Sequence, residues 1–358
     1  MHYSKVPEKP HGEIIMEENN LIKIIEEDLR LQHQESCKAA PGELDKKWEF
    51  LTSNEPKRFI NEDLTLNTVA LRNFRKLCIF IPDSPASDPS LLNIINLFSG
   101  GRRGSRRMLK ECFDLVRRLG YLNLLKKYPS SRIGCPNIFH YKGYQYTFRW
   151  VRHIIFLGVF KEILGNKLKK GFATLDIGSS YGIFAYLLKN EFPHSHNVLL
   201  DFPEQLVLAY YFLGMTFPDA KIAGYKEISR VDKIDREFIE KYDFVLIPWF
   251  LYKNISPESI DLITNFASLG EMKREWFNYY LKSEPFLSTK YFFTVNRFQS
   301  APTFDNDLTI LDYPLNEFNK LHFRVSPYFS HCYTPKYFFL YEKFMFSSQY
   351  FEFIGERK

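Results

Sequence analysis

One stretch of the sequence decides the fold: Thr174-Leu175-Asp176-Ile177-Gly178-Ser179-Ser180-Tyr181-Gly182. Its apolar first half is typical of a buried strand, and its glycines are typical of a turn that leads into a helix. A second apolar run follows the predicted helix and also ends in an acid: Asn197-Val198-Leu199-Leu200-Asp201. Strand, turn, helix and strand in this order predict a βαβ unit with a ligand site at the carboxyl ends of its strands.

The turn favours a cationic ligand over a dinucleotide. A dinucleotide fold needs the pattern G-x-G-x-x-G, because the pyrophosphate must approach the backbone closely. Counted from Gly178, the later glycines of that pattern would fall at Ser180 and Ile183. The chain instead reads D-x-G-x-x-x-G, and the carboxylate of Asp176 would repel a pyrophosphate. An NAD-type oxidoreductase is therefore disfavoured.

The D-x-G-x-x-x-G pattern resembles motif I of class I S-adenosylmethionine-dependent methyltransferases, whose ligand carries an ammonium and a sulfonium group. The usual family form has a glycine where this chain has Ser180. The resemblance implies an α/β, Rossmann-like methyltransferase sheet, mostly parallel with an antiparallel C-terminal strand. It also implies S-adenosyl-L-methionine as cofactor, with Asp201 holding the ribose hydroxyls. The cofactor-binding residues expected on this basis are Asp176, Gly178, Ser179, Ser180, Gly182, Asp201, Phe202 and Asn265.

A second polar cluster follows the fourth predicted strand. Asn265, Ser268 and Glu271 come together there, and the fifth predicted strand ends in Asn296-Arg297. Loops at the carboxyl ends of parallel strands carry the chemistry of open α/β sheets. Glu271 is therefore a candidate general base, an acid favoured by the dipole of the following helix, or both.

Four segments together narrow the resemblance: D-I-G-S-S-Y-G, L-D-F-P-E, N-F-A-S-L-G-E-M and V-N-R. They resemble the sugar O-methyltransferases of polyketide-glycoside and surface-polysaccharide gene clusters, over roughly residues 130–300. In that family Asp-Leu-Pro-Glu follows the second strand, where this chain has Phe202 for leucine. The resemblance implies methylation of a sugar hydroxyl on a glycoside, a nucleotide sugar or a polysaccharide precursor.

Transfer of a methyl group to a sugar hydroxyl requires a base within hydrogen-bond reach of that hydroxyl. The catalytic residues expected are Glu271, Ser268 and His331, and His322 and His153 are further candidates for the base. No acidic cluster has the spacing of a metal site, so no metal is expected. Methylation of another small molecule or of nucleic acid stays open, although the amino-methylation motif N/D-P-P-Y/F is absent after the fourth strand.

The composition limits the class of protein. The 358 residues, 45% of them hydrophobic, suffice for one large domain or two ordinary ones. A net charge of +6 suits anionic small molecules and does not require nucleic acid. Five separated cysteines without a C-x-x-C pair indicate reduced thiols. No secretory signal or long apolar run is visible, so we expect a cytoplasmic protein, with peripheral membrane contact and oligomeric state left open.

The order of apolar runs predicts a helical segment followed by an α/β domain. We expect a mainly helical N-terminal segment over residues 1–144, which could cover the substrate, and a methyltransferase domain over residues 145–358. Predicted helices span residues 17–31, 64–80, 108–125, 148–164, 183–190, 204–217 and 272–281, and residues 128–146 are predicted to form a loop. Predicted strands span residues 173–177, 197–202, 243–249, 260–265 and 290–296, with 323–329 and 336–344 as a closing antiparallel pair.

Three further groups of residues each allow two interpretations. Residues 100–107 are predicted to form a glycine-rich basic loop, whose arginines either bind a phosphorylated or lipid-linked sugar or a membrane surface, or are simply solvated. The aromatic residues near position 140 either stack on a sugar or pack in the core. Three residues at helical spacing before the first strand either face the substrate cleft or lie in solvent. These groups are, in order, Arg102, Arg103, Arg106 and Arg107; Phe139, Tyr141, Tyr144 and Tyr146; and Arg149, Arg152 and His153.

Overall fold

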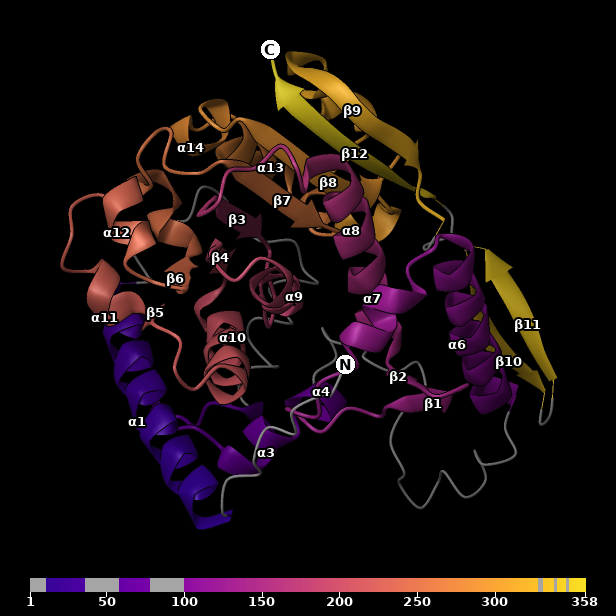
Figure 1. The fold of residues 1–358 in the computed structure, drawn as a ribbon, viewed down its shortest axis with the longest axis horizontal. Coiled ribbons are helices and arrows are strands. Elements are labelled where there is room, and N and C mark those ends of the chain that lie inside the picture. Colours follow the sequence, from indigo (N-terminus) through magenta and orange to yellow (C-terminus); the bar gives the residue numbers. More distant parts are fainter. Residues whose placement is uncertain (1–10, 36–57, 78–99, 328–330, 338–339, 346–347) are drawn as a thin grey trace.

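A computed structural model of the chain describes residues 11–35, 58–77, 100–327, 331–337, 340–345 and 348–358 (Figure 1). Its centre is an eight-stranded sheet in the order β5-β6-β4-β3-β7-β8-β12-β9. The parallel strands are β3 (Ala173–Ile177), β4 (His196–Asp201), β5 (Ile222–Ala223), β6 (Phe244–Pro248), β7 (Leu262–Phe266) and β8 (Tyr291–Arg297). The strand β12 (Tyr350–Arg357) lies between β8 and β9 (Phe318–Val325) and pairs antiparallel with both, so β9 runs in the same direction as the parallel strands.

The strand order defines the class of fold. With the short β5 set aside, the strands counted in chain order from β3 run third, second, first, fourth, fifth, seventh, sixth across the sheet. The predicted Rossmann-like class I methyltransferase sheet, mostly parallel with an antiparallel C-terminal strand, is therefore confirmed. The chain reverses its direction of winding between β3 and β7, and ligands of open α/β sheets bind at such a switch point.

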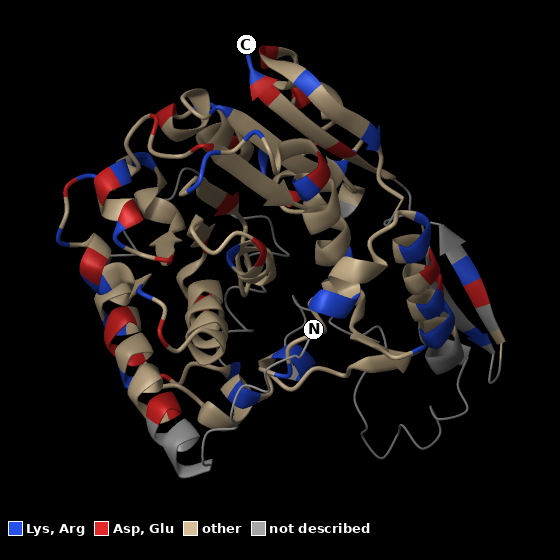
Figure 2. Cartoon of the chain, in the orientation of Figure 1, with Lys and Arg blue, Asp and Glu red and all other residues tan. Residues whose placement is uncertain are grey.

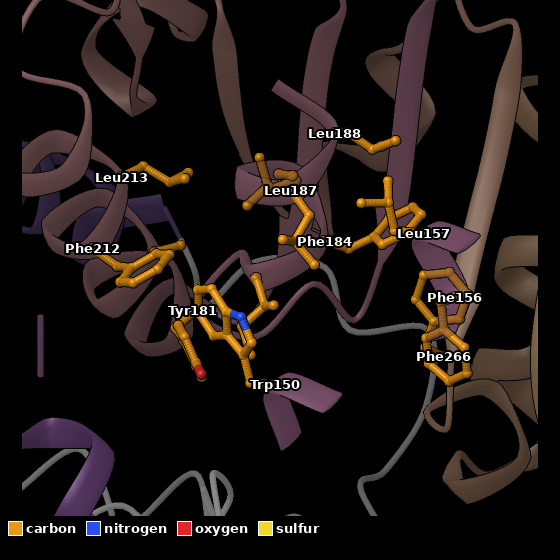
Figure 3. Close-up of a cluster of buried hydrophobic side chains, with 14 of the residues drawn as sticks. Trp150, Phe156, Leu157, Tyr181, Phe184, Leu187, Leu188, Phe212, Leu213 and Phe266 are labelled. Atoms are coloured by element: carbon orange, nitrogen blue, oxygen red, sulfur yellow. The ribbon is translucent and has the colours of Figure 1, made fainter. Parts of the chain in front are cut away.

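Helices cover both faces of the sheet. One face is covered by α8 (Phe148–Leu164), α9 (Ile183–Glu191) and α10 (Pro203–Thr216), and the other by α11 (Tyr225–Ile228), α12 (Arg236–Glu240), α13 (Arg274–Leu281) and α14 (Glu284–Leu287). Successive side chains of a strand point to opposite faces, so Leu199 joins the first core while Val198 and Leu200 join the second. Because both faces are covered, the predicted strands are continuous apolar runs. Figure 3 shows the first core, where the ring of Phe156 stacks on Phe266 with centroids 4.5 Å apart.

The N-terminal part of the chain packs on the first core. Its described elements are α1 (His11–Glu35), α3 (Thr68–Arg72), α4 (Phe74–Leu77), α6 (Gly100–Arg118), α7 (Leu122–Lys127), β1 (Phe139–Tyr141) and β2 (Tyr144–Tyr146). Helix α1 lies along α10 and α11 (Figure 1). The carboxylate of Glu18 accepts hydrogen bonds from Arg72 Nε at 3.0 Å and from the Tyr211 hydroxyl at 2.7 Å. These bonds join α1, α3 and α10 across a long sequence separation.

The basic loop predicted at residues 100–107 is wrong, because this segment forms the first half of α6. Ser105, Met108, Leu109 and Cys112 are buried at helical spacing, while Arg106 and Arg107 are exposed on the opposite side. Figure 2 shows basic residues along this helix. A glycine in a helix costs about 1 kcal/mol relative to alanine. Burial of the apolar stripe outweighs that cost.

The predicted end of the sheet is only half right. Residues 323–325 lie in β9, but residues 336–337 and 340–344 lie in the separate pair of β10 (His331–Tyr337) and β11 (Leu340–Met345), which packs beside α6. The strand that pairs with β9 is β12. Residues 350–357 were not among the predicted strands, and their Glu352 is fully buried and accepts a hydrogen bond from Ser326 Oγ at 2.8 Å.

The loop predicted at residues 128–146 contains the short hairpin of β1 and β2. Lys142 and Gly143 form its turn, with φ angles of 50° and 79°. Two consecutive left-handed residues match the twist of a hairpin. Residues 64–80 contain two short helices, α3 and α4, instead of one long helix, and residues 78–80 lie outside the described part of the chain.

Candidate functional site

The turn after β3 is built from left-handed residues. Gly178 and Gly182 have φ angles of 73° and 81°, and Ser180 between them has a φ of 53°. A side chain at Gly178 would place its Cβ 2.2 Å from Ser268 Oγ, so another residue here would have to displace Ser268 and also adopt a left-handed φ. Ser180 stands where the family form has glycine, and it takes the left-handed conformation that such a position requires. The turn expected from the sequence is therefore present despite the serine.

Asp201 fastens this turn to the end of β4. Its Oδ2 accepts a hydrogen bond from the backbone N–H of Ser180 at 2.6 Å, and its Oδ1 accepts one from Phe202 N–H at 2.8 Å. Beside it, the hydroxyls of Ser179 and Ser180 are buried and have no hydrogen-bond partner among the described residues. Buried hydroxyls normally have partners, so these two point to a ligand that supplies them.

Three carboxyl groups at the ends of β3 and β4 resist ionisation. Burial raises the pKa of Asp176 to about 7 and that of Asp201 to about 6, and it raises the pKa of Glu204 to about 7. The charge of Asp201 adds to the effect on Asp176 and Glu204, while a hydrogen bond of 2.8 Å from Thr264 Oγ1 opposes it at Asp176. A ligand with positive charge would stabilise the ionised forms of all three.

Glu204 was not among the residues predicted for the site. It starts α10 directly after β4, in the segment L-D-F-P-E. The family resemblance includes this segment, so Glu204 could have been predicted as a site residue from the sequence. The structure adds that Glu204 is close enough to Asp201 for the two charges to interact.

Asn265 of β7 forms hydrogen bonds to the neighbouring strands β3 and β8. Its Nδ2 donates to the carbonyl of Ile177 at 2.7 Å and to Ser268 Oγ at 2.9 Å. Its Oδ1 accepts from Leu269 N–H at 3.1 Å and from Asn296 Nδ2 at 2.7 Å. These four bonds use the two donors and two lone pairs of the amide. Asn265 therefore holds Ser268 against the turn at Gly178.

The ends of β7, β8 and β12 carry a second polar group. Glu271 Oε1 lies 3.6 Å from Arg297 Nη2, and both side chains are mostly buried. The guanidinium of Arg297 lies 4.9 Å from the ring centre of Tyr350. Glu271 precedes α13, whose first turn contains Glu275 instead. Glu271 therefore ends the short 3-10 helix Leu269–Glu271 just before α13, and its two interpretations, as a base and as an acid at a helix start, both stay predictions.

The first turns of α8 reach the same edge of the sheet, because α8 runs antiparallel to β3. The Nε atoms of Arg149 and Arg152 are buried. The charges of both arginines partly offset the increase that burial causes in the pKa of Asp176. The alternative that this helix face lies in solvent is therefore wrong. His153 is also buried, and its Nδ1 lies 2.9 Å from the carbonyl of Arg149. A carbonyl only accepts, so Nδ1 carries the hydrogen and Nε2 has the lone pair.

The electrostatics keep His153 neutral. Burial first, and then the charges of Arg152 and Arg149, hold its pKa well below the ordinary value of 6.5. The other two histidines considered as bases lie elsewhere. His322 is on β9, where its Nε2 lies 3.4 Å from Glu352 Oε2. His331 begins β10, outside the central sheet. The side chain of His331 is not among those described, so its catalytic role stays a prediction.

The aromatic residues near position 140 surround Phe113 of α6. Its ring lies 5.2 Å from Tyr141 and 5.1 Å from Tyr144, and Phe139 packs on Tyr146 at 5.6 Å. Tyr146 is fully buried, and its hydroxyl donates to the carbonyl of Leu109 at 3.0 Å. Core packing therefore accounts for this cluster.

The described residues contain neither a metal-binding cluster nor a membrane-spanning helix. No group of three or more His, Cys, Asp or Glu in the described ranges is arranged to hold a metal ion. Within those ranges, no helix combines the length and the apolar character needed to span a membrane.

No protein-family model matches the sequence. No curated protein matches it either. Among solved structures, the chain is similar to precorrin-6y C5,15-methyltransferase from Geobacter metallireducens, with 13% identity and a TM-score of 0.31 over 56% of this chain and 86% of that one. It is also similar to phosphoethanolamine N-methyltransferase 2 from Haemonchus contortus, with 14% identity and a TM-score of 0.33 over 57% and 45% of the two chains.

A third similar structure is the pyocyanin biosynthetic protein PhzM, with 11% identity and a TM-score of 0.34 over 57% of each chain. This chain spans less than two thirds of PhzM and of the Haemonchus enzyme. The assignment of the fold rests on the strand order of the sheet and on the turn after β3.

Proposed function

We propose that the chain is an S-adenosylmethionine-dependent O-methyltransferase that acts on a sugar hydroxyl. The observation that supports the cofactor is the group of buried carboxyls at the switch point, Asp176, Asp201 and Glu204, around a left-handed turn. Raised pKa values and buried hydroxyls without partners are expected where a cationic, hydroxyl-bearing ligand is missing.

The residues present fit this cofactor. Asp176 and Glu204 would balance its positive charges, Asp201 would accept hydrogen bonds from the ribose hydroxyls, and Ser179 and Ser180 would bond to its polar groups. When bound, S-adenosylmethionine supplies an electrophilic methyl group. The other residues of the site do the remaining work: Asn265 and Ser268 hold the turn in shape, and Arg149 balances part of the acidic charge.

Glu271 is the proposed base, because it lies in the loop after β7, beside Arg297 at the end of β8. Its carboxylate would take the proton of the acceptor hydroxyl as that oxygen gains the methyl group. His153 is the second candidate, because its Nε2 carries a lone pair on a neutral ring. The matching segments L-D-F-P-E and N-F-A-S-L-G-E-M support a sugar as acceptor.

The proposed N-terminal segment, residues 1–144, would form one wall over this site. Arg75 of α4 is buried with its guanidinium 5.4 Å from the ring centres of both Trp150 and Tyr181. Tyr181 belongs to the turn after β3, and Trp150 belongs to α8. This contact supports the view that the segment helps to shape the cofactor turn.

Two measurements test the proposal in order. Calorimetry with S-adenosylhomocysteine tests the cofactor, and transfer of a tritiated methyl group to a panel of glycosides, nucleotide sugars, small phenols and RNA tests the acceptor. Methylation is expected among the sugars alone. Methylation of a phenol or of RNA with inert sugars would overturn the acceptor and leave the cofactor in place.

A further inference from the structure

The charged groups at the carboxyl edge of the sheet are divided by sign. The acids Asp176, Asp201 and Glu204 gather at the ends of β3 and β4. The ends of β8 and β12 carry Arg297 and Tyr350, and the charge of Glu271 acts on Tyr350 there. In the proposed methyltransferase the first half holds the cationic cofactor, so the second half faces the acceptor.

The guanidinium of Arg297 packs near two aromatic rings, but one of its N–H donors has no acceptor within the described residues. Its guanidinium lies 4.9 Å from the ring centre of Tyr350 and 5.7 Å from that of Phe304, and it also forms a hydrogen bond with the side chain of Tyr350. Its Nε is buried and has no hydrogen-bond partner within the described part of the chain. The separation of 3.6 Å between Nη2 and Glu271 is too long for a hydrogen bond. A buried guanidinium with an unused donor is costly unless an acceptor atom arrives.

Arg152 extends the positive charge toward the cofactor half. Burial raises the pKa values of Asp176 and Tyr350, and the charge of Arg152 opposes both increases. Arg152 therefore lies within electrostatic reach of both groups. Arg152 therefore stands on the boundary between the two halves. The charges of Arg152, Arg297 and Glu271 all act on Tyr350, and Arg297 and Glu271 are mostly buried, where water screens little.

We propose that the acceptor carries an anionic group, a phosphate or a carboxylate, and that Arg297 and Arg152 bind it beside the hydroxyl to be methylated. This inference rests on the proposed function. Guanidinium groups bind both kinds of anion through paired hydrogen bonds, which fix orientation as well as affinity. The anion would accept a hydrogen bond from Arg297 Nε, which is buried and has no partner within the described residues. Binding would then place the neighbouring hydroxyl with respect to Glu271.

The first test needs no turnover. Inorganic phosphate and acetate are titrated by calorimetry into the full-length protein with and without saturating S-adenosylhomocysteine. The wild type is expected to bind at least one anion, and Arg297→Gln to weaken that binding by about 10- to 100-fold. Arg297→Lys should keep part of the affinity, and Arg106→Gln, on the exposed face of α6, should keep all of it. No binding of either anion, or equal binding by Arg297→Gln, would overturn the inference.

The second test compares acceptors of matched shape: a hexose 1-phosphate, the corresponding uronic acid and the neutral methyl glycoside. The wild type should prefer a charged member by about tenfold or more in kcat/KM. Arg297→Gln should remove this preference by raising KM for the charged acceptor about tenfold more than KM for the neutral one. The preferred member identifies the anion as phosphate or carboxylate. Equal use of all three by the wild type would contradict the inference, whereas inert sugars with intact anion binding would contradict only the sugar acceptor.

Discussion

Ser268 Oγ occupies the place where a side chain on Gly178 would begin, 2.2 Å from the Cβ that alanine would bring. Gly178 also has a φ of 73°, which other residues adopt at a cost. The loop after β7 therefore packs directly on the turn after β3. This contact links the proposed acceptor half of the site to the cofactor half.

Gly178→Ala should strain the turn and displace Ser268. We expect a loss of about 1–3 kcal/mol in the free energy of unfolding, measured by urea denaturation, and weakened binding of S-adenosylhomocysteine. Adding Ser268→Gly should recover part of the loss, because it removes the overlap but not the left-handed φ. A double variant no more stable than Gly178→Ala would mean that Ser268 is not the obstacle.

Asp201→Ala should weaken S-adenosylhomocysteine binding by about 1–3 kcal/mol, the range for a buried hydrogen-bonding group left without its partner. Two effects combine, because Asp201 accepts from the N–H groups of Ser180 and Phe202 as well as from the proposed ribose. Calorimetry measures the affinity. Asp219→Ala, at an exposed position, is the matched control. Unchanged affinity in Asp201→Ala would remove this residue from the cofactor site.

Glu204→Gln should change how stability depends on pH. Burial raises the pKa of Glu204 from 4.5 to about 7, so the folded chain holds the proton more tightly than the unfolded chain between these values. The contribution of Glu204 to stability is then largest in acid and is lost as the pH rises through this window. The difference in free energy of unfolding between wild type and variant should fall from pH 4.5 to pH 7 and then level off. A flat difference would show that Glu204 titrates normally.

The core of the fold could be predicted because its signals are local. The buried strands β3, β4, β6, β7 and β8 are apolar runs, and the D-x-G-x-x-x-G turn places Asp176 and Gly178 by itself. The strand β12 escaped prediction because Glu352 interrupts its apolar pattern. Arg324 and Ser326 satisfy that carboxylate from β9 and the residue after it, and no local signal reveals such partners.

The candidate site, like the fold, could be predicted from the sequence only where its signals are local. Asp176 and Asp201 follow from strand ends, whereas the approach of Arg152 to Asp176 depends on how α8 lies on the sheet. The pairing of Glu271 with Arg297 depends on the order of β7 and β8, which no local spacing encodes. At α6 the local signal was misleading. The glycines of residues 100–107 predict a loop, although buried residues such as Met108 and Cys112 recur at helical spacing.

Arg75→Met should destabilise the protein by about 2–4 kcal/mol. The guanidinium of Arg75 donates to the carbonyl of Ser131 at 2.6 Å and to Ser130 Oγ at 3.1 Å, and methionine leaves both acceptors without this donor. Urea denaturation measures the loss, with the neighbouring exposed residue as control in Lys76→Met. If Arg75→Met also weakens S-adenosylhomocysteine binding, the N-terminal segment shapes the turn at Tyr181. Equal stability of the two variants would contradict the structural role of Arg75.

Glu271→Gln tests the proposed base. The amide keeps the size of the side chain and can still accept a hydrogen bond, but it cannot take a proton. We therefore expect kcat for methyl transfer to fall by about 10²–10⁴-fold with little change in S-adenosylhomocysteine affinity. Glu275→Gln, in the first turn of α13 and exposed, is the matched control and should retain wild-type turnover. Full turnover in Glu271→Gln at saturating acceptor would move the role of base to another group. His153→Gln is then the decisive variant, because the lone pair on its Nε2 belongs to a neutral ring at the same edge of the sheet.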